Sequence, residues 1–269
     1  MDDTVIMEDA CTRTTIRRVA AMLDQPPPET AVMPRGWHLA LFAPDPAQSL
    51  LRPDGYGGVG VPLPDTGLPR LMFGGRRTTF LTDIPIDRPL QRHSRLLSAI
   101  PKTGRSGRMV VATVHHAIRA GSQDLLTEEQ DFVLREAAQP APVPAPPTAP
   151  TIGSGGARTP DGIPFTATET MLLRFCALTF NTHRIHYDHP YATQVEGYDA
   201  LVVNGGLTTL MLTELFRAKA GREPSTLTTR NLRPLFCNRT NTLHATAGDP
   251  WRVWAEDETG APSLEAQIT

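Results

Sequence analysis

The sequence predicts an α+β fold built as two halves of similar size, and two observations lead to this prediction. A run of proline and small residues, AAQPAPVPAPPTAP at 137–150, interrupts the chain near its middle. Such a run stays extended, lacks a normal set of backbone donors and has little to bury. After it, one apolar helix-like segment precedes several strand-like runs, an arrangement typical of α+β proteins. We therefore expect an N-terminal domain at 1–138, a linker at 139–162 and a C-terminal domain at 163–269.

The first half contains one helix-like segment and several strand-like segments. The pattern predicts a short helix at 14–23, followed by a loop-rich region at 25–70 that contains three consecutive prolines and a glycine cluster. Strands are expected where β-branched and apolar residues concentrate between turn signals. These predicted strands are 71–80, 90–100, 109–117 and 124–134.

The second half opens with a predicted helix at 166–178, which has a threonine cap and apolar residues at helical spacing. The segment 207–219, LTTLMLTELFRAK, is apolar on nearly every side, so we expect a buried central helix there. Strand-like runs close the chain at 226–235, 241–247, 251–256 and, more weakly, 263–268.

Composition excludes several classes of protein. The 269 residues carry 26 basic and 28 acidic side chains, so a net charge of -2 gives no electrostatic reason to propose nucleic acid or an anionic membrane as partner. The three cysteines are widely spaced without a CxxC pair, which argues against a disulfide framework and a thiolate zinc site. The acidic N-terminus does not match a signal peptide, and no apolar run approaches membrane-spanning length. We expect a cytoplasmic protein.

Chemically useful residues concentrate in the histidine-rich segment at 181–192, and three interpretations compete. His183, His186 and His189 lie three residues apart, so a continuous helix would bring them near one face as metal ligands. Pro190 and the neighbouring β-branched and aromatic residues disfavour such a helix. Each histidine could instead be structural. The third interpretation is that one histidine is a general acid/base with a polar partner five positions before it.

The segment FNTHRIHYD at 180–188, followed by Tyr191 and Ala192, resembles the signature of MaoC-type hydratases. It is most similar to the branch of double-hotdog proteins that contains mesaconyl-C4-CoA and itaconyl-CoA hydratases. Further similarity to this branch occurs in VEGY at 195–198, LVV at 201–203, RNLRPLF at 230–236, RSG at 105–107 and TEEQD at 127–131. The resemblance implies two hotdog folds in one chain, each an antiparallel sheet wrapped around a central helix, with a non-catalytic first half.

The resemblance also implies roles for individual residues. His186 occupies the position of the catalytic histidine, whose pKa near neutrality suits proton transfer. Asn181 stands where many members carry a catalytic aspartate, and an asparagine can hold water or orient the imidazole but cannot take its proton. Asp188 could orient His186 or be structural. We therefore name His186, Asn181 and Asp188 as candidate catalytic residues.

Asn204, Gly205 and Gly206 are the candidate thioester-binding residues. The unpaired N–H groups at the start of the 207–219 helix would stabilise negative charge on a thioester oxygen, and glycine lets the thioester approach closely. The alternative is that these glycines only permit a tight turn. The family usually has histidine-glycine where this chain has Asn204-Gly205. Arg184, Arg230 and Arg233 are candidates for contacts with the phosphates of CoA. The alternative for each of them is a solvated or structurally paired arginine.

The combined expectation is reversible hydration of an enoyl-thioester with a short branched or dicarboxylic acyl group, such as mesaconyl or itaconyl. The substrate would be carried by CoA or an acyl carrier protein. No metal or redox cofactor is expected, and the sequence neither predicts nor excludes a homodimer. One alternative is a 3-hydroxyacyl-[acyl carrier protein] dehydratase of fatty-acid or natural-product biosynthesis. Another is a non-catalytic hotdog that binds acyl-thioesters, and a weaker one is a thioesterase.

Overall fold

The computed structural model describes residues 4–58, 60–104, 107–136 and 162–269. Nearly all of the predicted linker, and Arg105 and Ser106 of the RSG motif, lie outside the described residues. No helix in the described ranges is long and apolar enough to cross a bilayer.

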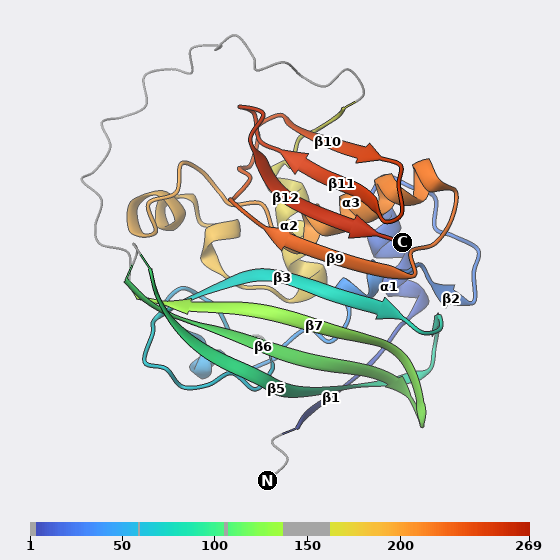
Figure 1. Ribbon diagram of the computed structural model, residues 1–269, viewed down its shortest axis with the longest axis horizontal. Coiled ribbons are helices and arrows are strands. Elements are labelled where there is room, and N and C mark those ends of the chain that lie inside the picture. The colour runs from blue at the N-terminus through green and yellow to red at the C-terminus, as the bar shows by residue number, and fades with distance from the viewer. Residues whose placement is uncertain (1–3, 59, 105–106, 137–161) are drawn as a thin grey trace.

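The molecule is built on one ten-stranded sheet in which every neighbouring pair of strands is antiparallel (Figure 1). The strands of the first half are β1 (Val5–Ala10), β3 (Arg70–Phe80), β5 (Pro89–Gly104), β6 (Gly107–Ala120) and β7 (Gln123–Arg135). Those of the second half are β8 (Ile163–Phe165), β9 (Thr226–Asn231), β10 (Asn241–Thr246), β11 (Trp251–Glu256) and β12 (Pro262–Ile268). Two short strands, β2 (Val32–Met33) and β4 (Ile84–Pro85), form a separate pair.

The two halves share one strand order. The sheet runs β1-β5-β6-β7-β3 in the first half and, from the opposite edge, β8-β10-β11-β12-β9 in the second. If the sheet strands of each half are numbered along the chain, both orders are 1-3-4-5-2. The halves meet where β3 pairs with β9, with Arg76 opposite Thr229. Two equivalent sheets are therefore joined edge to edge into a continuous one.

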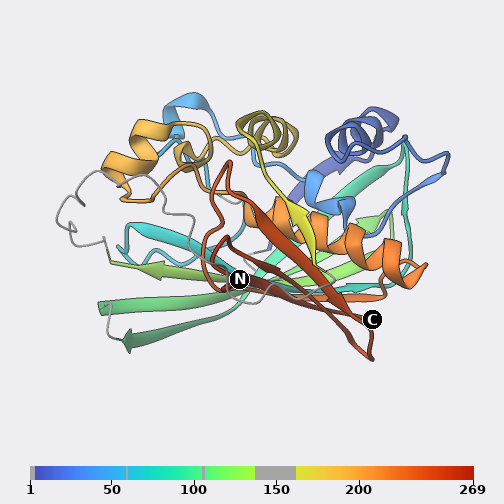
Figure 2. The same cartoon turned by 90° about the horizontal axis from the view of Figure 1, so that it is seen from above.

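The helices lie on one face of this sheet (Figure 2). Within the described residues three are α-helices: α1 (Arg13–Met22), α2 (Glu169–Thr179) and α3 (Gly205–Ala220). The predicted central helix is α3, which packs against β10, β11 and β12, while α1 packs against α2. The short helical turns are η1 (Trp37–Ala40), η2 (Gln48–Leu50), η3 (Arg184–His186) and η4 (Tyr191–Val195). The predicted α+β double hotdog is confirmed.

The halves differ in helix content between their first and second sheet strands. In the second half this connection holds the sixteen-residue α3, whereas the described residues of the first half contain only α1, η1 and η2 there. The central helix predicted for each half is therefore found in the second half and not in the described residues of the first. Prolines and glycines at 26–69 prevent a long helix in this stretch of the first half. Its loops instead reach toward the second half, where they complete the site.

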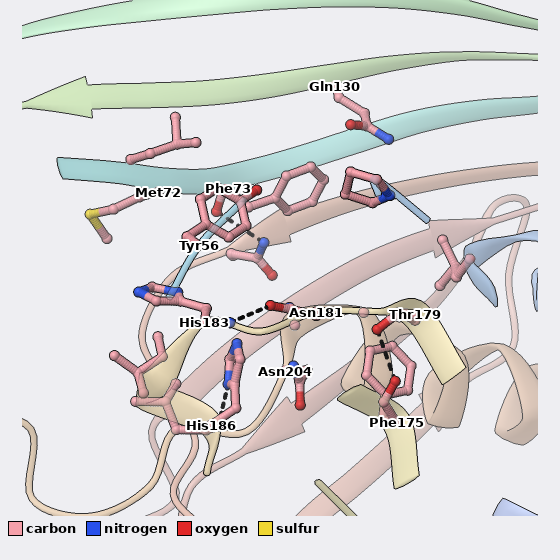
Figure 3. Close-up of a pocket in the computed structure, with 18 of the residues that line it drawn as sticks. Tyr56, Met72, Phe73, Gln130, Phe175, Thr179, Asn181, His183, His186 and Asn204 are labelled. Carbon is pink, nitrogen blue, oxygen red and sulfur yellow. Dashed lines mark hydrogen bonds between the residues drawn. The ribbon is translucent and has the colours of Figure 1, made fainter. Parts of the chain in front are cut away.

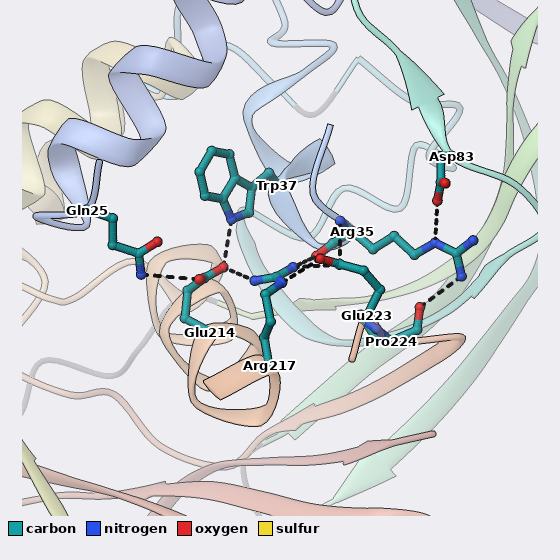
Figure 4. A network of polar contacts seen from close by, with 8 residues as sticks. All are labelled: Gln25, Arg35, Trp37, Asp83, Glu214, Arg217, Glu223 and Pro224. Atoms are coloured by element: carbon teal, nitrogen blue, oxygen red, sulfur yellow. Dashed lines mark hydrogen bonds and ion pairs between the residues drawn. The ribbon is translucent and has the colours of Figure 1, made fainter. Parts of the chain in front are cut away.

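The two halves share one hydrophobic core. A single cluster of buried apolar side chains contains Val19 and Leu126 from the first half and Leu210 and Val253 from the second. A polar network joins them at the far end of α3, where Trp37 donates to Glu214 at 2.7 Å and Arg217 donates to the carbonyl of Arg35 at 2.6 Å (Figure 4). These contacts fix the first-half loop against α3.

Candidate active site

A cavity of about 560 Å³ opens between the two halves. Its walls come from the first-half loop that contains Tyr56, from β3 and β7, and from the second-half segment at 179–186 (Figure 3). The start of α3 closes it from below. The cavity is lined by six of the nine candidate catalytic, thioester-binding and CoA-binding residues, Asn181, His186, Asn204, Gly205, Gly206 and Arg233.

His186 is the one buried histidine of the predicted segment. Its Nδ1 lies 2.7 Å from the carbonyl oxygen of Val202, which can only accept, so Nδ1 carries the proton. Burial, together with the neighbouring His183, lowers the pKa of His186 to about 4, although the bond to Val202 opposes this shift. His186 is therefore neutral at physiological pH. The lone pair of Nε2 is left to accept a proton from a molecule in the cavity.

The backbone around His186 holds its ring in place. η3 is a single turn, in which His186 N donates to His183 O at 3.2 Å, and Val202 N donates to Ile185 O at 2.9 Å. Val202 also forms an isolated bridge with Phe236. The carbonyl that selects the tautomer of His186 is therefore anchored on both sides.

Asn181 lies directly after α2. The helix ends at Phe180, whose left-handed backbone (φ 49°) turns the chain into the cavity. The side-chain oxygen of Asn181 accepts from His183 N at 3.0 Å. This bond occupies the acceptor and leaves the NH₂ group as a donor for a molecule in the cavity. Asn181 and His186 thus offer one donor and one acceptor from the same short segment (Figure 3).

The start of α3 lies beside these two residues. Asn204 occupies the N-cap position, yet its side chain caps no backbone N–H and instead contacts the thiol of Cys176. The first N–H groups of α3, at Gly205 and Gly206, therefore keep their capacity to bind an oxygen atom in the cavity. A Cβ atom at Gly206 would lie 3.0 Å from the Phe175 ring, whereas one at Gly205 would be in ordinary contact, 3.5 Å from Asn231. Packing is therefore tight at position 206 and freer at position 205.

Asp188 is committed to Arg184. Its Oδ2 accepts from Arg184 Nε and NH2 at 3.0 and 2.8 Å, and its Oδ1 accepts from Tyr191 N at 3.1 Å. These bonds lower the pKa of the Asp188 carboxyl. None of them reaches His186, which instead takes its orientation from Val202. Of the two roles considered for Asp188, this geometry matches the structural one.

The three arginines proposed for CoA lie in different environments. Arg184 is held by Asp188, by the carbonyl of Pro53 and by the Tyr191 ring 4.0 Å away. Arg230 is exposed on β9, and the residues that line the cavity do not include it. Arg233 lines the cavity and is half exposed, with only a long 3.8 Å pair to Asp257. Of the three arginines, Arg233 is therefore the one that lines the cavity.

First-half residues complete the site, which the sequence did not indicate. Arg184 N donates to Asp54 O at 2.8 Å, and Thr182 Oγ1 donates to Gly55 O at 2.6 Å. Tyr56 places its ring 5.4 Å from that of His183. Burial raises the pKa of Tyr56. These contacts join segments about 130 positions apart, and no local sequence pattern identifies such pairs.

The metal interpretation finds no counterpart in the described ranges, where no three potential ligands come together. The rings of His183 and His186 lie edge to face with centroids 5.8 Å apart, but His189 is exposed to solvent.

Comparisons with known proteins agree with this geometry. A model of the hydroxyacyl-thioester dehydratase type 2 family matches residues 36–237. Mesaconyl-C(4)-CoA hydratase of Chloroflexus aurantiacus is 36% identical over 269 aligned positions, which cover 98% of this chain and 93% of the relative. Among solved structures, HtdX of Mycobacterium tuberculosis superposes with a TM-score of 0.68 at 18% identity, over 98% of both chains. A MaoC-like dehydratase from Phytophthora capsici gives 0.70 at 14% identity, over 100% of this chain and 95% of the other. The chain therefore belongs to the hydroxyacyl-thioester dehydratase type 2 family and is a hydro-lyase.

Proposed function

We propose that this protein reversibly hydrates an enoyl-CoA whose acyl group is short and branched or dicarboxylic. The observation that carries the proposal is the pairing of a neutral, buried imidazole with a helix N-terminus across one cavity. The imidazole supplies a base, and the helix supplies donors for a developing negative charge. The mesaconyl-C(4)-CoA hydratase of C. aurantiacus supports the acyl class, because its similarity extends along nearly the whole chain.

His186 and Asn181 would together activate the attacking water. The NH₂ group of Asn181 donates to the water oxygen, while Nε2 of His186 takes one of its protons. The water oxygen bonds to the β-carbon, and the electron pair of the double bond moves onto the thioester oxygen. The N–H groups of Gly205 and Gly206 stabilise that oxygen. The imidazolium then returns its proton to the α-carbon, so one water is added and His186 is regenerated.

One histidine is enough for this cycle, because it first removes and then returns the same proton. The replacement of the usual aspartate by Asn181 is therefore compatible with turnover. No step requires a metal ion or redox cofactor. We further propose that Arg233 contacts a CoA phosphate and that the reaction takes place in the cytoplasm.

The test is a mass-spectrometric assay with a panel of enoyl-CoA thioesters in heavy-oxygen water. We expect a product one water heavier that carries the label. His186→Ala should lower kcat by roughly 10²- to 10⁴-fold and Asn181→Ala by roughly 10²-fold. His189→Ala is the matched control, because this exposed histidine lies in the same segment and should keep its activity.

Other outcomes separate the competing functions. Label incorporation only with substrates on an acyl carrier protein would identify the carrier-protein dehydratase instead. Thioester binding without turnover, and without any effect of His186→Ala, would identify a non-catalytic binding protein. Release of free thiol would identify a thioesterase.

A further inference from the structure

The first-half end of the cavity contains a buried polar cluster that the hydration mechanism does not use. It consists of His38, Arg76, Arg92, His116, Glu128 and Gln130, and all six side chains line the cavity. They come from η1 and from β3, β5, β6 and β7, so the half expected to be non-catalytic supplies every one of them. We call this set the first-half cluster.

Glu128 is the only acidic member of the first-half cluster, and its partners satisfy it. It accepts hydrogen bonds from Thr78 at 2.5 Å, from Arg76 at 3.4 Å and from Gln130 at 2.5 Å, and it lies 3.2 Å from His38 Nε2. Burial opposes its ionisation, but Arg76 and His38 outweigh burial and hold the pKa of Glu128 well below its usual range. The charge of Glu128 is therefore matched mainly by Arg76.

Arg92 is a second guanidinium that no carboxylate in the described residues pairs with. Its NH2 donates to Gly60 O at 3.0 Å and contacts Met7 Sδ at 2.8 Å, while its buried Nε has no hydrogen-bond partner in this part of the chain. Glu128 and, to a lesser extent, Asp9 raise its pKa, but neither has a hydrogen bond to it in the described residues. The Asp9 carboxylate accepts instead from the N–H groups of Ala10 and Phe42. Burial lowers the pKa of Arg92 to about 10, so it stays cationic at neutral pH.

Further donors in the first-half cluster also lack partners. Nε2 of His116, a residue only 1% exposed, and Nε of Arg76 make no hydrogen bond within the described ranges. Burial lowers the pKa of His116 to about 4, so its ring is neutral. If Ser94 donates to its Nδ1 across 2.9 Å, the ring proton is on Nε2. The Gln130 amide lies near this ring and raises the pKa of His116 against the effect of burial, yet the described residues include no hydrogen bond between Nε2 and Gln130 of ordinary geometry. Buried donors without partners are costly, so these positions favour a ligand that presents acceptor oxygen atoms.

The first-half cluster is linked to the active site by direct contacts. The Asn231 side chain lies beside Gly205 and donates to the carbonyl of Phe73 at 3.1 Å. The Phe73 ring in turn lies 4.9 Å from the Arg76 guanidinium. In Figure 3, Gln130 lies on the side of the cavity opposite His186, and Phe73 lies between these two residues. An acyl group bound at α3 would therefore extend toward the first-half cluster.

We propose that Arg92 and His116 bind a carboxylate at the distal end of the acyl group, with Arg76 as a further donor. This assigns substrate selection to the first half of the chain, and it rests on the proposed function for the position of the thioester. The guanidinium of Arg76 bonds to Glu128, whereas that of Arg92 has no hydrogen bond to a carboxylate in the described residues, so a substrate carboxylate would be its direct ionic partner. A long apolar acyl chain would leave these buried donors unsatisfied, so the cluster discriminates against fatty-acyl substrates.

The test compares substrates that differ only in this carboxylate. Mesaconyl-C4-CoA and 3-methylcrotonyl-CoA form one pair for turnover, and succinyl-CoA and butyryl-CoA form a second pair for binding by calorimetry. We expect the carboxylate to improve both kcat/KM and Kd by roughly 10²-fold in the wild type, and we expect Arg92→Met to abolish most of this preference. His116→Leu should reduce it by roughly tenfold. Arg95→Met, at an exposed position on the same strand, is the control and should keep the full preference.

The two readouts separate this proposal from the proposed function. If Arg92→Met weakens both members of each pair equally, or if the wild type shows no preference for the carboxylate, the subsite is refuted even when hydration is observed. If no enoyl-CoA is hydrated but succinyl-CoA still binds through Arg92, the hydratase function fails and the carboxylate subsite stands. His116→Leu provides the same comparison should Arg92→Met fail to fold.

Discussion

At the scale of single residues, the burial of His186 predicts the pH dependence of the reaction. Its pKa is lowered to about 4, mainly by burial, and protonation would remove the lone pair that accepts the proton of water. We expect the ionisation of His186 to leave kcat/KM unchanged above about pH 5.5 and to lower it tenfold per pH unit below about 4. Initial rates with a substrate whose charge is constant over this range would measure the profile.

A decrease in kcat/KM that begins near pH 6.5, the ordinary pKa of histidine, would contradict the burial of the ring in the free enzyme. His183→Gln is a useful comparison, because His183 contributes to lowering the pKa of His186. In that variant the decrease in kcat/KM should occur at slightly higher pH, while the bond between His186 and Val202 stays intact.

Residues close together in sequence could be placed from the sequence alone, but their partners could not. Asn181 and His186 lie five positions apart in one short segment, and both line the same cavity. By contrast, the residue that orients His186 is Val202, through a backbone carbonyl that carries no side-chain signature. Tyr56 and Arg92 reach the cavity only because β3 pairs with β9 across the two halves. Such contacts depend on tertiary structure, which a local motif does not encode.

At the scale of elements, the start of α3 distinguishes its two glycines. Gly205→Ala places a methyl group in ordinary contact, and alanine favours a helix by up to about 1 kcal/mol over glycine. The same methyl group would obstruct the thioester beside the helix N-terminus. We therefore expect the variant to retain or gain thermal stability while kcat/KM falls by roughly 10²-fold. Melting temperature and steady-state kinetics would measure the two effects.

Gly206→Ala should behave in the opposite way with respect to stability. Its methyl group would lie 3.0 Å from the Phe175 ring, so we expect the free energy of unfolding to decrease by about 1–3 kcal/mol. If Gly205→Ala leaves kcat/KM unchanged, the glycines serve only the turn into the helix, and the proposed oxygen-binding site is wrong.

Elements with a clear periodicity were predicted well, whereas the edge strands β1 and β8 and the end of the central strand β9 were not. The strand predicted at 251–256 matches β11, and the helix predicted at 14–23 matches α1 within one residue. β8 escaped prediction because Pro164 argues against a strand, although an edge strand tolerates it. The strand predicted at 226–235 ends at Asn231, since Leu232 N and Arg233 N both turn to Ser263 O.

At the scale of the whole molecule, the network at the far end of α3 should hold the two halves together. Arg217 bonds to Glu214, to Glu223 at 2.7 Å and to the carbonyl of Arg35 (Figure 4). Arg217→Met leaves a partly buried Glu214 without its arginine, so we expect a loss of about 3 kcal/mol in the free energy of unfolding. Chemical denaturation would measure it. Lys219→Met, which is exposed on the same helix, should change stability by less than about 0.5 kcal/mol.

The buried histidines also predict how the stability of the whole molecule depends on pH. Burial lowers the pKa of both His116 and His186 from 6.5 to about 4, so between these values the unfolded chain binds more protons than the folded one. The free energy of unfolding should therefore be highest above about pH 6.5 and decrease as the pH falls toward 4, by roughly 3 kcal/mol for each histidine. Urea denaturation across this range would measure the slope. His116→Gln should make this slope smaller, whereas His189→Gln, at an exposed position, should leave it unchanged. Equal slopes in the wild type and both variants would mean that His116 is not buried as a neutral ring.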